Sequence, residues 1–400
     1  MLSLFGRFLR FGLLAWGGPV AQIAMLRKEL VDEERWVSSE RFNRLLAVYQ
    51  VLPGPEAHEL AVHLGMLRGG RLGGLLAGLG FMLPGFILVL VLAALYVSID
   101  LGQPALAAAL LGIQVGVVAL VTRAVDRIGR HILVDRWAWL IALVAAVATL
   151  ATVPFWLVLV LSGAAYALAA GLAGPRRPVV VASLAILAAV AVAAVAFGVA
   201  ARLGAAASAL PAPAAQPSDA TLPALFLAGL KAGLLTFGGA YTAIPFVRGD
   251  AVGSGWISDP QFLDALALSG VLPAPLIIFA TFVGFLAGGL PGAIVVTLGI
   301  FLPAFGFALV LGDRLEAIVA RPGLHRLLEG VAAGVVGIIA VTALELALTL
   351  ASRVPSLPAA ALLFVAALVV LYRWSSRAAI PAVIVGSAIL GWAAFDLLSG

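Results

Sequence analysis

Residues 51–55 read Val-Leu-Pro-Gly-Pro and residues 271–275 read Val-Leu-Pro-Ala-Pro, each inside a long apolar stretch. Every proline removes a backbone donor and obstructs the helical turn before it. Membrane helices tolerate such an interruption where neighbouring protein or water satisfies the freed backbone groups. The two motifs therefore predict two interrupted membrane helices, one in each half of the chain.

Other motifs surround both interruptions in the same order. The offset between the matching positions stays between 219 and 221 residues, which indicates an internal repeat. The matched pairs are Gly12-Leu13-Leu14-Ala15-Trp16-Gly17-Gly18 with Gly233-Leu234-Leu235-Thr236-Phe237-Gly238-Gly239, Trp36-Val37-Ser38 with Trp256-Ile257-Ser258, and Gly65, Gly69, Gly70 and Gly73 with Gly284, Gly288, Gly289 and Gly292.

The composition excludes a soluble globular enzyme. Of the 400 residues, 63% are hydrophobic and 11% are charged, against about 25% charged in soluble domains. A membrane span needs about 20 mostly apolar residues, and several uncharged stretches are that long. The composition predicts an all-α, polytopic membrane protein. The uncharged stretches are 72–99, 101–122, 137–175, 180–201 and 265–312.

Hydropathy predicts 12–13 membrane segments in two copies. Residues 1–201 form the N-terminal copy with one unmatched segment, 179–201; 202–221 form an Ala/Pro-rich linker, and 222–400 the C-terminal copy. Seven segments precede the second copy, and an odd number inverts it, as in many secondary transporters. The predicted segments are 8–24, 42–65, 73–98, 104–122, 137–151, 154–172, 179–201, 222–246, 262–287, 291–312, 327–350, 356–372 and 378–397.

The distribution of Lys and Arg favours a cytoplasmic N-terminus. With that orientation 16 basic residues lie in cytoplasmic regions and 7 lie outside, in keeping with the positive-inside rule. Five of the seven exceptions fall in residues 25–44. Either an interfacial helix or a first segment that re-enters the membrane explains them. The net charge of +5 therefore reflects membrane orientation rather than nucleic-acid binding.

The interruptions predict an anion-binding site. A helix that restarts at Pro55 directs the free N–H groups of Glu56 and Ala57 into the break, and helix N-termini attract anions. Leu276 occupies the corresponding place in the second half. The alternative is that both prolines only kink the helices for packing. The candidate binding residues are Pro53, Gly54, Pro55, Glu56 and Ala57, with Pro273, Ala274, Pro275 and Leu276.

Two Gly-Gly turns and four basic residues complete the predicted site. Glycine permits positive φ angles or a close approach of the backbone to a solute, although close helix packing is an equally good explanation. A cation inside the membrane is costly and usually functional, unless the side chain snorkels to an interface. The turns are Gly17-Gly18-Pro19, with Gln22 nearby, and Gly238-Gly239. Arg10 and Lys231 are the candidate binding cations, and Arg27 and Arg248 are the candidate mouth-lining residues.

Three ionisable residues share one helix face after the first break. Glu56, Glu59 and His63 are spaced i, i+3 and i+7, so they are candidates for proton coupling. Alternatively, Glu56 only completes a helix terminus. The sequence has no Cys and no phosphate-binding loop, so neither a metal, a cofactor nor an enzymatic activity is expected.

These motifs resemble the chromate ion transporter (CHR) family, in its long two-domain form. The resemblance rests on Phe11-Gly12, Trp16-Gly17-Gly18-Pro19, Gln22-Ile23, Arg35-Trp36 and Leu52-Pro53-Gly54-Pro55-Glu56. It implies export of chromate across the bacterial inner membrane, driven by ion gradients. It also implies that Gly17, Gly18, Pro19, Pro53, Gly54 and Pro55 matter for transport. The second copy departs from the pattern at Ala240 and Ala274, so the implied roles carry over less directly there.

The expected function is therefore secondary transport of a small oxyanion by a multi-pass protein in the lipid bilayer. The resemblance implies chromate, whereas the residues themselves do not separate chromate from sulfate. A passive anion channel and a non-transporting membrane module remain alternatives. The Gly-rich faces permit a homodimer.

Overall fold

In a computed structural model, the described residues are helical or lie in connecting turns, and none of them forms a strand. The description covers 1–16, 18–99, 103–169, 220–312, 314–319, 321–374, 376 and 378–396, together with 181, 188, 191–193, 195 and 196. Gly17, most of the predicted segment 179–201 and nearly all of the linker 202–221 lie outside the described residues.

The chain divides into two compact units that do not follow the sequence repeat. One unit comprises residues 1–124, 217–315 and 343–400, and the other comprises 125–216 and 316–342. The first unit therefore takes residues from both copies. Every predicted site residue falls within its ranges.

The first predicted segment, 8–24, turns back on itself. Helix α1 (Leu2–Leu13) is followed by α2 (Gly18–Arg27) and a π-helical turn (Lys28–Glu33). The Arg10 side chain of α1 forms an ion pair with Glu29, at the far end of α2. The chain thus enters and leaves at one end of the unit, which is the re-entrant alternative, with residues 14–16 in the first tip.

The second predicted segment, 42–65, also turns back. Helix α3 (Ser39–Val51) and α4 (Glu56–Ser98) flank the first break, residues 52–55. The Tyr49 hydroxyl lies 2.8 Å from His63 Nδ1, although 14 residues of straight helix extend about 20 Å. The interpretation of 42–65 as a crossing was wrong, because the Pro-Gly-Pro break reverses the chain.

Helix α4 reverses once more at two glycines. Gly69 and Gly70 depart from helical angles, and Gly70 has a φ of 62°. A Cβ atom on Gly65 would lie 2.7 Å from the Gly73 carbonyl oxygen, so the arms 56–68 and 71–98 pack closely side by side. The second copy repeats this turn at Gly289, with a φ of 61°.

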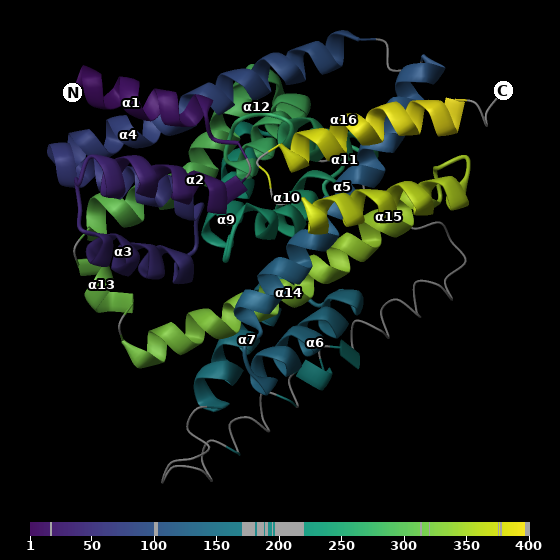
Figure 1. Cartoon of the computed structure of the whole chain (residues 1–400). Coiled ribbons are helices and arrows are strands. Elements are labelled where there is room, and N and C mark those ends of the chain that lie inside the picture. The colour runs from purple at the N-terminus through teal and green to yellow at the C-terminus, as the bar shows by residue number, and fades with distance from the viewer. Residues whose placement is uncertain are drawn as a thin grey trace. The chain divides into compact units, whose positions relative to one another are not determined.

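The second copy repeats the whole arrangement. In order it contains α9 (Leu222–Leu234), η3 (Ala240–Ala243), α10 (Ile244–Ala251), α11 (Asp259–Gly270), η4 (Leu276–Ile278), α12 (Phe279–Gly306) and η5 (Phe307–Leu311). Gly12 of α1 packs against the Phe81 carbonyl of α4, and the equivalent Gly233 of α9 packs against the Ile300 carbonyl of α12. The pair α9–α12 therefore corresponds to the pair α1–α4, whose two helices lie next to each other in Figure 1.

The two copies run in opposite directions. Gly74 of α4 packs against Leu309, and Gly78 packs against Phe305. Residue numbers thus rise along α4 while they fall along the helix it contacts, so the long arms are antiparallel. The predicted all-α architecture with inverted repeats and broken helices is confirmed.

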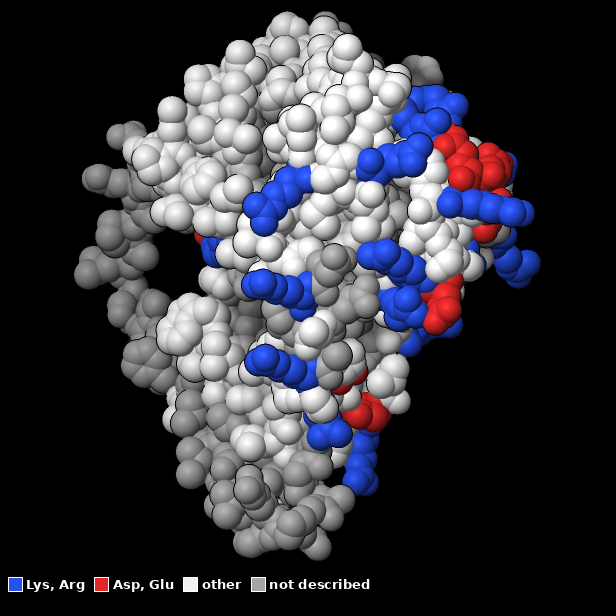
Figure 2. Space-filling view, turned by 90° about the vertical axis from the view of Figure 1, so that its left-hand side faces the viewer, with Lys and Arg blue, Asp and Glu red and all other residues white. Residues whose placement is uncertain are grey.

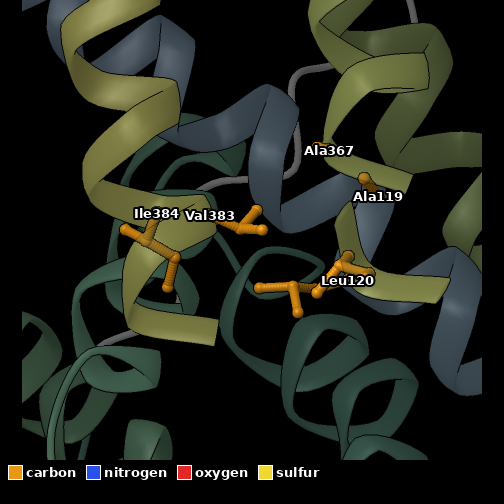
Figure 3. Packing of buried hydrophobic residues seen from close by; sticks show 6 residues of the cluster. Ala119, Leu120, Ala367, Val383 and Ile384 are labelled. Carbon is orange, nitrogen blue, oxygen red and sulfur yellow. The ribbon is translucent and has the colours of Figure 1, made fainter. Parts of the chain in front are cut away.

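Helices of the C-terminal region cover the second break, residues 271–275. Ala119 and Leu120 of α5 (Pro104–Ile132) form a cluster with α15 (Leu357–Arg373) and α16 (Ala379–Gly391) (Figure 3). Val271 of the break packs against this cluster. Two further helices, α13 (Arg314–Val319) and α14 (Pro322–Ala351), precede α15, and a π-helical turn (Trp392–Asp396) follows α16.

The other unit contains α6 (Arg136–Leu150), α7 (Phe155–Ala169), the end of α5 and the first part of α14. Gly330 of α14 packs against the Ser162 carbonyl of α7, and Gly334 packs against the Ser162 side chain. These contacts show that this glycine pair allows α14 and α7 to pack closely.

Among the described residues, five helical stretches are long and apolar enough to cross a membrane: Glu56–Ser98, Pro104–Ile132, Leu276–Leu311, Pro322–Ala351 and Ala379–Asp396.

The re-entrant hairpins also account for the basic residues of 25–44, which were exceptions to the positive-inside rule. Arg7 pairs with Glu34, and the guanidinium of Arg68 lies 5.5 Å from the ring of Trp36. Residues 25–44 therefore lie at the same end of the unit as the N-terminus.

Candidate functional site

Both predicted interruptions are present. Helix α3 ends at Val51 and α4 starts at Glu56, while α11 ends at Gly270 and the helix resumes at Leu276. Gly54 has a φ of 151°, a backbone conformation that residues other than glycine rarely adopt. Pro273, Ala274 and Pro275 are buried, as are Pro55 and Ala57, whereas Pro53 and Leu276 are partly exposed.

Each break contacts the opposite copy. The Gly54 N–H donates a 2.7 Å hydrogen bond to the Thr236 carbonyl oxygen, which precedes Gly238-Gly239. In the second break, Ala274 packs against Gly85 of α4, where an added Cβ would lie 2.5 Å from the Ala274 Cβ. The breaks therefore lie at the interface between the inverted copies, the region where transporters of this architecture bind substrate.

A small cavity lies beside the second break. Its volume is about 30 Å³, and its lining includes Trp16 of the first tip, Gly18 of α2, Ser269 of α11, and Ala274 and Leu276 of the break. The structure therefore brings the predicted Gly-Gly turn of one copy to the predicted helix start of the other. This inner cavity is the candidate anion site.

Two features make the inner cavity suited to an anion. The Ser269 side chain is 2% exposed, and its hydroxyl has no hydrogen-bond partner within the described part of the chain. The 3-10 turn that starts at Leu276 and leads into α12 carries no acidic residue, so the positive end of the helix dipole meets no carboxylate from that turn. Sequence reasoning missed Ser269, because a single serine carries no pattern.

The first break has the opposite chemistry. Glu56 and Glu59, in the first turn of α4, are buried. The Glu59 carboxyl lies against the backbone of Gly54, and its oxygens have no hydrogen-bond partner among the described residues. The repeat puts Leu276 and Phe279 at the equivalent positions. A carboxyl group thus fills one break, whereas the other has a cavity.

Two histidines follow Glu56 on α4. His63, predicted with Glu56 and Glu59, forms a hydrogen bond with the Tyr49 hydroxyl of α3. His58, which sequence reasoning did not select, is fully buried, and its ring lies 4.8 Å from that of Phe301 and 5.0 Å from that of Phe305. These two phenylalanines belong to the other copy, whereas Phe81, at 6.2 Å, belongs to the same one.

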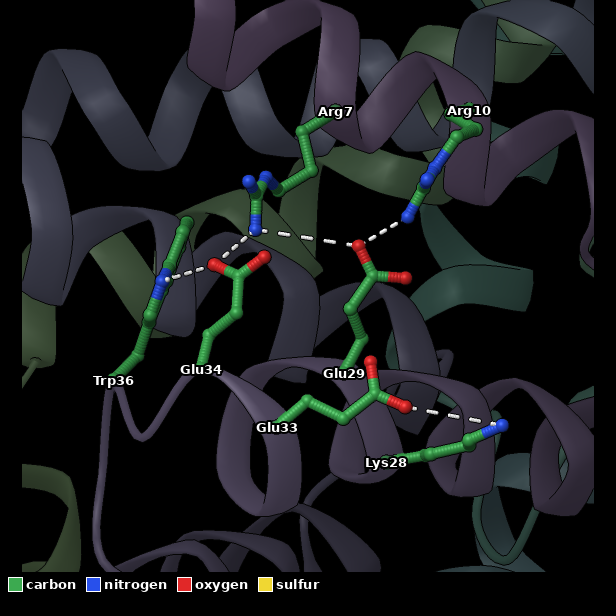
Figure 4. A network of polar contacts seen from close by, with 7 residues as sticks. All are labelled: Arg7, Arg10, Lys28, Glu29, Glu33, Glu34 and Trp36. Atoms are coloured by element: carbon green, nitrogen blue, oxygen red, sulfur yellow. Dashed lines mark hydrogen bonds and ion pairs between the residues drawn. The ribbon is translucent and has the colours of Figure 1, made fainter.

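The two predicted binding cations form equivalent ion pairs. Arg10 pairs with Glu29, and Lys231 pairs with Asp250. Both partners lie 19 residues further along the chain, because both hairpins return at the same distance. Figure 4 shows the first pair within a wider network that joins Arg7 to Glu29 and Glu34, and Lys28 to Glu33. In this structure both cations hold the arms of their hairpins together.

The Glu34 carboxyl of this network remains ionised under ordinary conditions. The hydrogen bond from Arg7 lowers the pKa of Glu34 below its usual value, and the charges of Arg7 and Arg10 act in the same direction. A lowered pKa means that the pair is intact above the ordinary carboxyl range and is lost as the pH falls through the lowered value.

The predicted mouth-lining residues also have partners. Arg27 donates hydrogen bonds of 3.0 Å to Ser39 Oγ and 3.2 Å to Asn43 Oδ1. Arg248 pairs with Asp259 at 2.8 Å and with Glu345 at 2.7 Å. Each arginine thus anchors the start of the helix that leads to a break, and a role in lining the mouths stays a prediction.

The Gly-Gly turns are conformational rather than packing features. Gly18 has a φ of 78° and Gly239 a φ of 117°, and nothing lies within 4 Å of a Cβ added at either position. Gly238 also has a positive φ, of 70°. Pro19 lies in the first turn of α2, and the Gln22 side chain donates a 3.0 Å hydrogen bond to the Ala15 carbonyl, which closes the first tip.

A further buried carboxylate links four parts of the first unit. Asp264 of α11 accepts hydrogen bonds of 2.8 Å from the Tyr96 hydroxyl of α4 and 2.7 Å from the Gln114 amide of α5. Gln114 in turn accepts a 3.3 Å hydrogen bond from Arg353. This network joins the two copies, and it does not form part of the inner cavity lining.

The Lys231–Asp250 pair provides a test of its structural role. Lys231→Asp alone is expected to lower the free energy of unfolding. Loss of an exposed ion pair costs roughly 1 kcal/mol and loss of a buried one roughly 3 kcal/mol. Because both side chains are partly buried, we expect a value between these two. The double variant with Asp250→Lys is expected to restore thermal stability in detergent. If Lys231 binds the anion, the exchange restores stability without restoring anion binding.

Comparison with known proteins is consistent across the chain. Residues 2–168 and 223–392 match the sequence model of the family described as chromate transporter. A chromate transport protein of Pseudomonas aeruginosa is 58% identical over 393 residues, which cover 98% of this chain and 92% of that protein. A chromate transport protein of Cupriavidus metallidurans is 29% identical over 98% of this chain and 92% of its own length. No solved structure matches.

Proposed function

The chain belongs to the chromate transporter family, and from this premise we propose that it is a secondary transporter that carries chromate out of the cytoplasm. The anion binds in the inner cavity, where the helix start at Leu276 and the Ser269 hydroxyl supply donors. A tetrahedral dianion suits such a site, because helix N-termini bind oxyanions through backbone N–H groups. The observation that most directly supports this proposal is the inner cavity itself, which lies at the interface of the inverted copies.

The size of the inner cavity supports a carrier rather than an open channel. A volume of about 30 Å³ holds one or two water molecules, since each needs roughly 10–15 Å³ on the same measure. A five-atom oxyanion therefore requires the cavity to enlarge. Coupling of binding to a conformational change is the property that separates a carrier from a pore.

The first break is the coupling site in this proposal. Glu59 lies against Gly54, and no described residue donates a hydrogen bond to its carboxyl; it shares a helix with Glu56 and His63. Membrane-embedded carboxyl and imidazole groups of this kind serve as proton relays in transporters. Proton movement at the first break thereby drives anion movement at the second.

The orientation follows from the basic residues. The end of the unit that holds the N-terminus carries Arg7, Arg10, Arg27, Lys28 and Arg35, in addition to Arg41, Arg44, Arg68 and Arg71. The positive-inside rule assigns this end to the cytoplasm, and membership of the family supports a location in the inner membrane of a bacterium. The homodimer stays a prediction, because Gly-rich pairs such as Gly330 and Gly334 pack against helices of the same chain.

A reconstituted flux assay tests this proposal. Purified protein in liposomes is given labelled chromate or sulfate, with and without a pH gradient across the membrane. The expected result is saturable chromate uptake against its concentration gradient when the pH gradient is present. Flux that only equalises the two concentrations would identify a passive channel, and faster sulfate than chromate flux would identify a sulfate carrier.

A further inference from the structure

An open groove lies next to the inner cavity in the same unit. Its volume is about 560 Å³. It extends from the charged π-helical turn after α2 to the first tip, and the start of α16 forms its other wall. Its lining residues are Leu14, Trp16, Met25, Lys28, Glu29, Glu33, Ala378 and Pro381.

Trp16 and Pro381 line both the groove and the inner cavity. These two side chains therefore form the partition between a larger, open space with charged side chains in its lining and a smaller, more enclosed one. The groove starts at residues that share an end of the unit with Arg7 and Arg10. A solute at that end thus reaches the candidate anion site across a single layer of side chains.

We infer that this groove is the access route from the basic end of the protein to the inner cavity, and that Trp16 is the barrier that must move to admit the anion. The inference rests on the proposed function, since it takes the inner cavity as the anion site. It adds the path by which the anion arrives and the side chain that controls it.

The charged side chains at the groove mouth are paired. Glu29 pairs with Arg10, and Lys28 pairs with Glu33 at 3.8 Å, so both carboxylates of the lining face a cation. Lys28 is 76% exposed, and its ammonium group is accessible to a solute. On the face drawn in Figure 2, Lys and Arg side chains are exposed with fewer acidic side chains among them, and such a surface raises the local concentration of anions.

Trp16 is packed less tightly than its counterpart in the second copy. Trp16 lies between two helices and is partly exposed, whereas the equivalent Phe237 is 4% exposed. Both backbones are held by hydrogen bonds: the Trp16 N–H donates one of 2.8 Å to the Leu14 carbonyl oxygen, and the Phe237 N–H donates one of 3.0 Å to the Thr242 hydroxyl. The movement that opens the partition is therefore a movement of the Trp16 side chain, which borders an open groove, while its counterpart is buried.

Cysteine labelling tests the route, because the native sequence has no Cys. Ser269→Cys puts a thiol in the inner cavity, and an anionic, membrane-impermeant methanethiosulfonate is applied from the basic end of reconstituted protein. Adding Trp16→Ala is expected to accelerate modification at least about tenfold, because removing a side chain that closes a packed path exposes what lies behind it. Leu14→Cys, in the groove, is expected to react rapidly with or without Trp16→Ala.

Two controls keep the result interpretable. Thr281→Cys, fully buried elsewhere in α12, must remain unmodified in the Trp16→Ala protein, which shows that the fold is intact. Leu276→Cys is a second cavity reporter if Ser269→Cys does not fold. Unchanged labelling of both reporters in the Trp16→Ala background, or faster labelling from the opposite end, would overturn the route. Labelling requires no transport. An absence of chromate flux would therefore refute the proposed function, whereas the labelling rates alone decide whether the access route exists.

Discussion

Gly12→Ala is expected to destabilise the protein strongly, whereas Gly6→Ala on the same helix is not. A Cβ at Gly12 would lie 2.5 Å from the Phe81 carbonyl oxygen, and nothing lies within 4 Å of a Cβ at Gly6. The first contact involves backbone of α4 that a rotamer change cannot move. Overpacking of this kind costs about 1–3 kcal/mol, while alanine gains about 1 kcal/mol over glycine in an unobstructed helix. The two substitutions therefore have opposite expected signs.

Thermal unfolding of the purified protein in detergent measures the difference. Gly233→Ala is a second test, because Gly233 packs against the Ile300 carbonyl in the equivalent place and should reproduce the loss. Equal melting temperatures for Gly12→Ala and Gly6→Ala would contradict the close packing of α1 on α4. A loss at Gly12 without one at Gly233 would contradict the equivalence of the two copies.

The sequence predicts the breaks well and the path of the chain poorly. Pro53 and Pro55 interrupt a helix for covalent reasons, so the break follows from residue type alone. Whether the chain continues or reverses after the break depends on what it packs against, and hydropathy is the same in both cases. The basic residues of 25–44 were evidence for a reversal, because they fit the positive-inside rule if the preceding segment returns to the side of the membrane from which it started.

The same limit applies to the candidate site. Lys231 is recognisable as a costly cation in an apolar segment, but its partner Asp250 comes within reach only because the hairpin returns. Ser269 becomes notable once it is known to line a cavity and to have no hydrogen-bond partner among the residues that the structure describes. His58 becomes notable when phenylalanines of the other copy surround it. Contacts between the two copies depend on how the copies are arranged in space, so the sequence of one copy does not predict them.

Glu59→Gln is expected to abolish the dependence of chromate transport on the pH gradient. The equivalent position in the second copy is Phe279, so the repeated fold does not itself require an acid there. A buried carboxyl in a membrane helix is costly and is usually kept for function. Glutamine retains the size and the polar end of the side chain, while it removes the exchangeable charge.

The ionisable groups around Glu59 are Glu56, His58 and His63 on α4, and Tyr49 on α3 through its hydrogen bond with His63. Among them Glu59 is the one that lies in the break itself, against Gly54. Liposome uptake with an imposed pH gradient is expected to fall at least about tenfold in Glu59→Gln, to the level of downhill exchange, because the group that carries the proton is lost. Glu40→Gln is the matched control, since Glu40 is an exposed carboxylate on α3.

The interpretation depends on the pH profile as well as on the rate. A structural role for Glu59 would lower uptake equally at every pH and would lower the melting temperature, whereas a proton carrier is expected to leave the melting temperature of Glu59→Gln close to that of the native protein. Glu59→Asp, which keeps the carboxyl group, is expected to restore part of the gradient-driven uptake. If Glu59→Gln retains native uptake and its native response to pH, the carboxyl in the first break has no part in coupling, and the chemical difference between the two breaks must have another cause.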